Sequence, residues 1–381
     1  MVHLDVSDQA RLVDAVRRGS DQELRELPSS IASEEKILPQ RLAALAAVGD
    51  GAAGEQLRLF ILRQDELVVE LEQAAVALQT AGVPFLLLRG FALQQRYPKT
   101  HIRQFNDLDL VVRDVTHLPT TIVALGRLGH HLTRPVTAWS APAGVWTGLA
   151  FNKERGRELP FYVDVAAGGP ALGCGVQHRI PDSAWASTDQ VSAAANVRTL
   201  GLTHLTVAFL VELVERDRCI VRDALDFIAL IDADGFDPDA VAGSLAGIPV
   251  RQGLQRLLPI LRASAQDRAR RLAARFAAAA APRSVSHQVR GTVARTLGSA
   301  GQVLARHRFD MALRLASDRI AVSAAVRTGL PVFLFPDPDR SLPGLPGAAI
   351  HASLDCFTAR VRPMATEAET EYCFSGEEWW R

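Results

Sequence analysis

Lysine and cysteine are scarce in this chain, and long apolar runs are absent. Its 381 residues include three lysines, Lys36, Lys99 and Lys153, so nearly all the positive charge is carried by arginine. The four cysteines are scattered, with no Cys-x-x-Cys pair and no Cys/His cluster at zinc spacing. That pattern is typical of a reducing compartment and excludes a structural zinc site. No apolar run reaches the roughly 18 residues that a membrane span needs.

Net charge is also absent, because 42 Lys and Arg residues balance 42 Asp and Glu residues. No overall field therefore favours nucleic acid or a membrane surface. With 48% hydrophobic and 22% charged residues, the composition is that of an ordinary globular protein. The N-terminal residues 1–5 carry no basic segment followed by an apolar one, so we expect no secretory leader. We expect a soluble cytoplasmic protein.

The zero net charge hides a local asymmetry. Residues 251–327 contain 15 arginines and three acids, an excess of +12, whereas the tail carries Glu367, Glu369, Glu371, Glu377 and Glu378. One interpretation is a solvated helical face. The other is the wall of a cleft that attracts a nucleotide or another polyanion, or a surface that docks a protein or peptide partner. The sequence leaves both open.

The length suits two or three domains. Helical periodicity runs from about residue 53 to 81, ends at Gly82 and cannot continue past Pro84. From residue 203 the pattern is helical again. We therefore expect a helical segment at 1–52, an α/β domain at 53–198, a helical domain at 199–328, and a Pro-rich connector with an acidic tail at 329–381.

Local patterns place several elements within the α/β domain. Short apolar runs predict strands, and apolar positions at helical spacing predict helices. The expected elements are strands at 85–88, 107–112, 146–151 and 159–165, helices at 91–97 and 118–128, and a hairpin turn at 152–158. In the C-terminal half, we expect helices at 203–217, 220–232, 237–246, 250–262, 264–281, 285–306 and 308–328.

The strand at 107–112 carries the most informative pair of residues. Asp107 and Asp109 are two positions apart and so point to one face, while Leu108 and Leu110 point to the other. Adjacent carboxylates repel each other, and a divalent cation such as Mg²⁺ relieves that repulsion. An exposed edge strand with two solvated aspartates is the alternative.

Further polar residues interrupt the neighbouring apolar segments. Asp164 lies inside an apolar strand and needs a partner, either a metal ion or an arginine. Gly90 follows a strand and opens a helix, whose free backbone N–H groups can bind phosphate, although a simple tight turn is the better interpretation of this glycine taken alone. Arg89 precedes this glycine, and Arg103 lies in a loop four residues before Asp107.

The order of these parts resembles the DNA polymerase β-like nucleotidyltransferase superfamily, most closely its bacterial branch of uncharacterised nucleotidyltransferases. The resemblance covers roughly residues 55–235. It is carried by residues 88–93, Tyr97-Pro98, Arg103, residues 107–112 and Asp164, and more weakly by Arg222 and Asp226. It implies an α/β (α+β) fold, in which helices flank a small mixed sheet, plus an all-helical C-terminal domain.

The resemblance also implies an activity. Such enzymes transfer a nucleoside monophosphate from an NTP, here expected to be ATP, to a hydroxyl or amine acceptor and release pyrophosphate. Two Mg²⁺ ions about 3.5–4 Å apart would serve the reaction. Asp107 and Asp109 would hold both ions, and Asp164 would complete the ion on the acceptor side. Arg89, Gly90 and Arg103 would bind the triphosphate. The acceptor could be a small molecule, a peptide or a protein.

Three departures from the family pattern keep other functions open. Relatives usually carry Lys-Gly where this chain has Arg89-Gly90, a His-aromatic pair after the third aspartate where it has Val165, and a Gly-Ser pair that it lacks. A catalytically weakened binding or accessory protein would show such changes. A nucleic-acid end-modifying enzyme is the second alternative, but the Arg-rich segment offers little more than Phe276 and Phe309 for base stacking. Nucleic acid is therefore not the expected partner.

Overall fold

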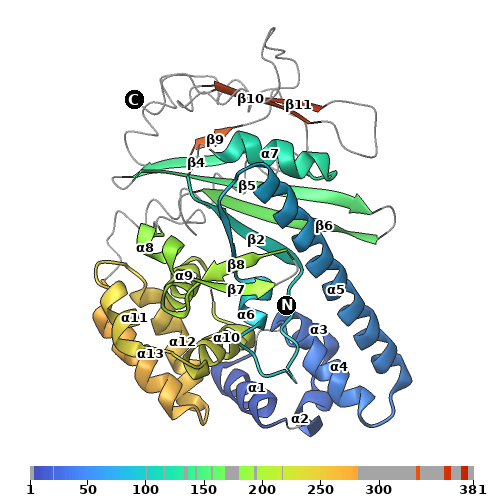
Figure 1. Cartoon of the computed structure of the whole chain (residues 1–381). Helices are drawn as coiled ribbons and strands as arrows, with labels where there is room; N and C mark the ends of the chain where they lie inside the picture. Colours follow the sequence, from blue (N-terminus) through green and yellow to red (C-terminus); the bar gives the residue numbers. More distant parts are fainter. Residues whose placement is uncertain are drawn as a thin grey trace.

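The protein has a mixed α/β architecture, here described from a computed structural model (Figure 1). The described residues are 4–281 and the segments 332–334, 356–361 and 370–375. Short gaps within the first range fall at 20, 100, 115–116, 133–135, 142–143, 156–157, 168–179, 193–194 and 217. Among the described helices, none is both long and apolar enough to cross a membrane.

Helices make up most of the described residues 4–80 and 202–281. They are α1 (Val6–Arg18), α2 (Asp21–Glu26), α3 (Ser29–Glu34), α4 (Leu38–Ala46), α5 (Gly51–Thr80), α6 (Gly90–Gln94), α7 (Leu118–Arg127), α8 (Asp182–Ala186), α9 (Leu202–Glu215), α10 (Val221–Asp232), α11 (Pro238–Ser244), α12 (Arg251–Ala263) and α13 (Asp267–Ala279). The strands are β1 (Phe85–Leu88), β2 (Asp107–Val112), β3 (His131–Leu132), β4 (Val136–Ala141), β5 (Gly144–Arg155), β6 (Glu158–Ala167), β7 (Thr188–Ser192), β8 (Val197–Leu200), β9 (Val332–Leu334), β10 (Cys356–Val361) and β11 (Thr370–Ser375).

The main sheet is mixed, as the expected fold class requires. Its strand order is β7-β8-β1-β2-β6-β5-β4-β9, with β3 beside β5, while β10 and β11 form a separate antiparallel pair. Strands β2 and β6 run parallel, and β1 pairs with β2 in the antiparallel sense. The central strands β1, β2 and β6 are therefore hydrogen-bonded on both edges.

Each face of the sheet is covered by its own set of helices. Leu108 and Leu110 of β2 pack with Leu67 and Leu71 of α5 in one core. Val111, which points to the opposite face, belongs to a second core built mainly from α9, α10, α12 and the N-terminal helix α1. Figure 1 shows α5 lying along the sheet and α9–α13 gathered beyond its other face. Asp107 and Asp109 share the face of Val111, because side chains alternate along a strand.

Most of the expected elements are present, with boundary shifts of a few residues. Helix α5 ends where Gly82 was expected to stop it, with Gly82 at φ 71°. The hairpin expected around 152–158 is present, but its strands are longer than predicted, because β5 continues to Arg155, which pairs with Glu158 of β6. The helix expected at 91–97 is α6, which starts at Gly90 and already ends at Gln94.

Several strands were missed by the sequence analysis. Strands β7 and β8 add an edge to the sheet, but β7 is polar and half-exposed and so lacks an alternating apolar pattern. Strands β9, β10 and β11 lie in the segment expected to be a connector and tail. The helices expected at 285–306 and 308–328 lie outside the described residues, and the domain boundaries stay predictions.

The Arg-rich segment is described only as far as α13. Arg270 pairs with Asp267, and Arg275 pairs with Asp239, both on the protein surface. Arg262 and Arg271 are exposed, and Arg283 lies outside the described residues. Arg251 and Arg256 are half-buried and donate to backbone carbonyls. The other arginines in the described part of this segment are exposed, which agrees with the solvated face, one of the two interpretations that the sequence left open.

Candidate active site

Three carboxylates meet on the face of the sheet that α9 and α10 cover. In the parallel pair of β2 and β6, Asp109 lies directly opposite Asp164, and Asp107 lies two residues earlier on the same face. One carboxylate oxygen from each of Asp107, Asp109 and Asp164 lies within 4.8 Å of the other two. The strand pairing therefore creates a cluster of hard oxygen donors, which suits a divalent cation.

The electrostatics of the cluster are unfavourable without a cation. Asp109 is 8% exposed. Burial, opposed by Arg89 and reinforced by the carboxylates of Asp107 and Asp164, raises the pKa of the Asp109 carboxyl to about 8. Like charges held together in a buried site favour protonation or a bound cation. These donors fit a metal ion, although their role as ligands stays a prediction.

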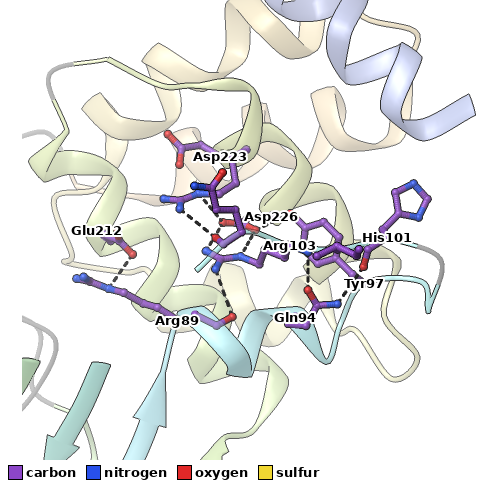
Figure 2. A network of polar contacts seen from close by, with 12 residues as sticks. Arg89, Gln94, Tyr97, His101, Arg103, Glu212, Asp223 and Asp226 are labelled. Carbon is purple, nitrogen blue, oxygen red and sulfur yellow. Dashed lines mark hydrogen bonds and ion pairs between the residues drawn. The ribbon is translucent and has the colours of Figure 1, made fainter. Parts of the chain in front are cut away.

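Arg89 reaches this cluster from the end of β1. Its Nη1 lies 3.2 Å from Asp109 Oδ1. Its Nε lies 2.8 Å from Glu212 Oε2 on α9, and Figure 2 shows this contact. Its backbone has φ 53°, a conformation that few non-glycine residues adopt. Arg89, which the sequence predicts to bind phosphate, thus bridges two carboxylates.

Gly90 is required by close packing as well as by its backbone angle. Its φ is 30°, and a Cβ at this position would lie 3.3 Å from the backbone oxygen of Asp107. A side chain here would push α6 away from the strand that carries the carboxylates. Gly90 therefore sets the distance between the strand-to-helix turn and the cluster.

Arg103 is not the exposed loop residue that its position suggested. It is 4% exposed, and its Nε and Nη2 donate to the two carboxylate oxygens of Asp226 at 2.7 and 2.8 Å. Its Nη1 donates to the carbonyl of Gly90, and Tyr97 also donates to Asp226 (Figure 2). Asp226 raises the pKa of Arg103 against the opposing effect of burial. This bidentate pair ties the turn at Gly90 to α10 and gives Arg103 a structural role, while its role in binding the triphosphate stays a prediction.

A cleft of about 290 Å³ opens beside the carboxylates. Residues from five separate parts of the described chain line it: Lys36, Arg89, Gly90, Arg103, Phe105, Asp107, Asp109, Glu212, Arg216 and Arg222. Five of these side chains are cationic and three are acidic. The wall opposite β2 comes from α9, α10 and the turn between α3 and α4 that carries Lys36. None of the arginines of α12 and α13 lines this cleft.

Several of these lining residues were not predicted from the sequence. Glu212 forms ion pairs with Arg89 and Arg216. Burial alone would raise the pKa of Glu212, but these two guanidinium groups outweigh burial and lower it to about 2. A glutamate within the apolar run of α9 could have been noticed, just as Asp164 was. Arg222 was noted only as part of the resemblance. For Lys36, no local pattern indicates a role.

Comparison with known proteins identifies the group to which this chain is related. Residues 52–263 match the sequence profile of a family described as uncharacterised nucleotidyltransferases. The chain belongs to this family. No curated protein matches the sequence. Among solved structures, a candidate nucleotidyltransferase from H. pylori is similar at 14% identity and a TM-score of 0.30, with 62% of this chain and 96% of that chain covered. JHP933 from Helicobacter pylori is similar at 13% identity and a TM-score of 0.29, with 64% and 97% covered.

The nucleotidyltransferase match contains nearly all of the candidate site. It runs from α5 to α12 and includes Asp107, Asp109, Asp164, Arg89 and Glu212. Lys36 lies outside it, on the N-terminal side. The family-wide part of this protein therefore carries the carboxylate cluster, whereas part of the cleft wall is supplied by a segment that the match does not reach.

Proposed function

We propose that this protein transfers a nucleoside monophosphate from an NTP, ATP by expectation, to a hydroxyl or amine acceptor and releases pyrophosphate, on a polymerase β-like fold. The observation that carries the proposal is the carboxylate cluster of Asp107, Asp109 and Asp164 at the edge of a cation-lined cleft. A cleft with both features suits a polyanionic substrate that is bound together with divalent cations.

The cationic side chains of the cleft are complementary to the negative charge of a nucleoside triphosphate. Glu212 is already neutralised by Arg89 and Arg216, which leaves Lys36 and Arg222 on the opposite wall with little acidic compensation. Preorganised cations of this kind stabilise the charge that develops on a departing pyrophosphate. In phosphoryl transfer, positioning and charge stabilisation supply most of the catalysis.

Asp107, Asp109 and Asp164 would hold the divalent ions, expected to be two Mg²⁺. When bound, such ions neutralise phosphate charge and polarise the phosphoryl oxygens. The carboxylate of Asp164 would accept the proton of the acceptor group. A bond then forms between the acceptor oxygen or nitrogen and the α-phosphorus, the bond from the α-phosphorus to the bridging oxygen breaks, and pyrophosphate leaves.

A binding protein without transferase activity is the second candidate. The observation that favours it is the ion pair between Arg89 and Asp109, because the guanidinium occupies a position that a metal ion would compete for. Such a protein would bind nucleotide in the same cleft but would not release pyrophosphate. The two candidates therefore differ in turnover and share the binding site.

Incubation with labelled ATP, GTP, CTP and UTP and Mg²⁺ separates them. Pyrophosphate release, together with transfer of label to an added acceptor or to the protein itself, is the expected result. Asp107→Asn and Asp164→Asn should lower the rate by about 10²-fold or more, whereas exposed Asp234→Asn should leave it unchanged. Mg²⁺-dependent nucleotide binding without pyrophosphate release from any NTP would favour the binding protein.

A further inference from the structure

Lys36 occupies a backbone conformation that normally selects glycine. It follows α3 with φ 56°, in the left-handed region. The N–H of Ile37 donates to the carbonyl of Ala32, and the N–H of Lys36 donates to that of Ser33, the two bonds that define a Schellman cap. Glycine is usual at this capping position because a side chain there is strained. A purely structural cap would be more stable with glycine.

The turn that carries Lys36 is fastened to the start of α10. Glu35, which is 1% exposed, accepts the N–H of Val221 at its Oε2 at 2.8 Å. Its backbone carbonyl accepts the N–H of Arg222 at 3.4 Å, and Arg218 donates to its Oε1. Glu35 therefore docks on two consecutive residues of α10, Val221 and Arg222. This contact places the neighbouring Lys36 on the same wall of the cleft as Arg222.

Arg222 is a buried cation with an unused donor. It is 8% exposed, and its Nε is buried without a hydrogen-bond partner among the described residues. The nearest carboxylate oxygen, Oδ2 of Asp226, is 3.9 Å away, and Arg103 holds that carboxylate through both oxygens. The Nη1 of Arg222 donates to the carbonyl of Gln104, so the guanidinium is held in place while part of its donor capacity is unused. A bound anion is one explanation of a buried donor without a partner, and Arg222 lines the cleft in which such an anion would lie.

The charges around Lys36 also favour a bound anion. Burial lowers the pKa of the Lys36 ammonium, the nearby cations Arg222, Arg216 and Arg103 lower it further, and Asp107 opposes them. Burial together with repulsion from Arg103 also lowers the pKa of Arg222. Cations that repel one another in a cleft are stabilised by a ligand that carries several negative charges.

We propose that Lys36 and Arg222 bind the phosphates of the nucleotide, so that the N-terminal helical segment completes a site that the family match alone leaves open. This inference rests on the proposed function for the identity of the ligand as an NTP. It adds a residue from outside the matched region to the substrate contacts. It also explains why a strained lysine stands at the cap of α3.

Stability and binding should change in opposite directions when Lys36 is replaced. Lys36→Gly removes both the strain and the ammonium, so its melting temperature should rise while its affinity for ATP falls by about 10- to 100-fold, as for the loss of a charged hydrogen bond. Lys36→Ala should lose the affinity without the gain in stability. Asn196→Gly, at the left-handed φ of 48°, and Lys99→Ala, at an exposed lysine, are the matched controls and should bind ATP like the wild type.

The scarcity of lysine allows a direct test of the contact. Brief acetylation with acetic anhydride, read by peptide mass spectrometry, reports on the three lysines separately. Saturating ATP with Mg²⁺, or tripolyphosphate alone, should protect Lys36 from acetylation and leave exposed Lys99 as reactive as before.

The outcomes separate this inference from the proposed function. Pyrophosphate release by the wild type, with unchanged ATP affinity in Lys36→Gly and no protection of Lys36, would overturn the inference while the transferase activity stands. Protection of Lys36 and weakened binding in Lys36→Gly, without turnover, would support the inference and remove the transferase activity. If neither ATP nor tripolyphosphate binds the wild-type protein, the inference fails.

Discussion

The guanidinium of Arg89 lies 3.2 Å from the carboxylate of Asp109. Arg89 directly follows β1, which pairs antiparallel with β2 so that Leu88 lies opposite Asp109. A cation of the protein thus occupies one side of a carboxylate that is expected to hold a metal ion. The same guanidinium is held by Glu212. A bound nucleotide that draws Arg89 from Asp109 to its own phosphates leaves the Asp109 carboxylate available to a metal ion. Nucleotide binding and metal binding would then favour each other.

Replacement of Arg89 should therefore strengthen metal binding in the absence of nucleotide. Arg89→Gln removes the competing charge, and we expect Mn²⁺ to bind about 10-fold more tightly, equivalent to about 1.4 kcal/mol. This affinity can be measured by isothermal titration calorimetry, or by the loss of the electron paramagnetic resonance signal of free Mn²⁺. Nucleotide binding by the same variant should weaken. Weaker Mn²⁺ binding than in wild type would show that Arg89 supports the metal site.

The stability of the metal-free protein should depend on pH through Asp109. Its pKa is about 3.9 in an unfolded chain and about 8 in the folded protein. Between these values the folded state binds more protons, so the free energy of unfolding falls as the pH rises from about 4 to about 8. Asp109→Asn should remove this dependence and melt above wild type at pH 8, by roughly 2–4 °C per kcal/mol of repulsion relieved.

Thermal melts in EDTA across this pH range test the assignment, with Asp234→Asn as an exposed control. A melting temperature for Asp109→Asn below that of wild type at high pH would mean that the ion pair with Arg89 outweighs the repulsion. Added Mg²⁺ should reverse the fall in stability of the wild type at high pH, because the cation replaces the proton.

Loss of Arg103 should destabilise the fold strongly. It leaves Asp226 buried at 1% exposure without its bidentate partner, which typically costs about 3–5 kcal/mol. Urea denaturation of Arg103→Ala measures this cost. The control is Arg113→Ala, which breaks an exposed ion pair with Asp182 and should cost less than about 1 kcal/mol. Equal effects of the two variants would contradict the structural role of Arg103.

Two glycine substitutions should have opposite effects. Gly90→Ala places a Cβ 3.3 Å from the backbone oxygen of Asp107 at a φ of 30°, so it should lower stability by about 1–3 kcal/mol and weaken metal binding. Gly243→Ala, inside α11 with open space around its Cβ, should raise stability by about 0.5–1 kcal/mol. Circular dichroism melts distinguish the two. An unchanged metal affinity in Gly90→Ala would separate the turn from the carboxylate cluster.

The sequence alone determined the parts whose signal is local. The alternation in residues 107–112 places Asp107 and Asp109 on one face, opposite buried Leu108 and Leu110, and the structure has that strand at the same residues. The 30-residue helix α5 and its end near Gly82 follow from helical spacing and a glycine stop. Such patterns are readable because each depends on residues within a few positions of one another.

Only the tertiary structure decided which distant residues meet. The register that sets Asp109 opposite Asp164 pairs β2 with β6, and a helix and three other strands separate these two strands in the sequence. Strand β7 pairs at the edge of the sheet although its polar residues show no alternating apolar pattern. Arg103 looked like a free loop cation, yet its partner Asp226 lies 123 residues away. Glu35, beside Lys36, meets the N–H of Val221 186 residues later. These contacts depend on how two cores pack around one sheet, a property of the whole chain that local periodicity does not encode.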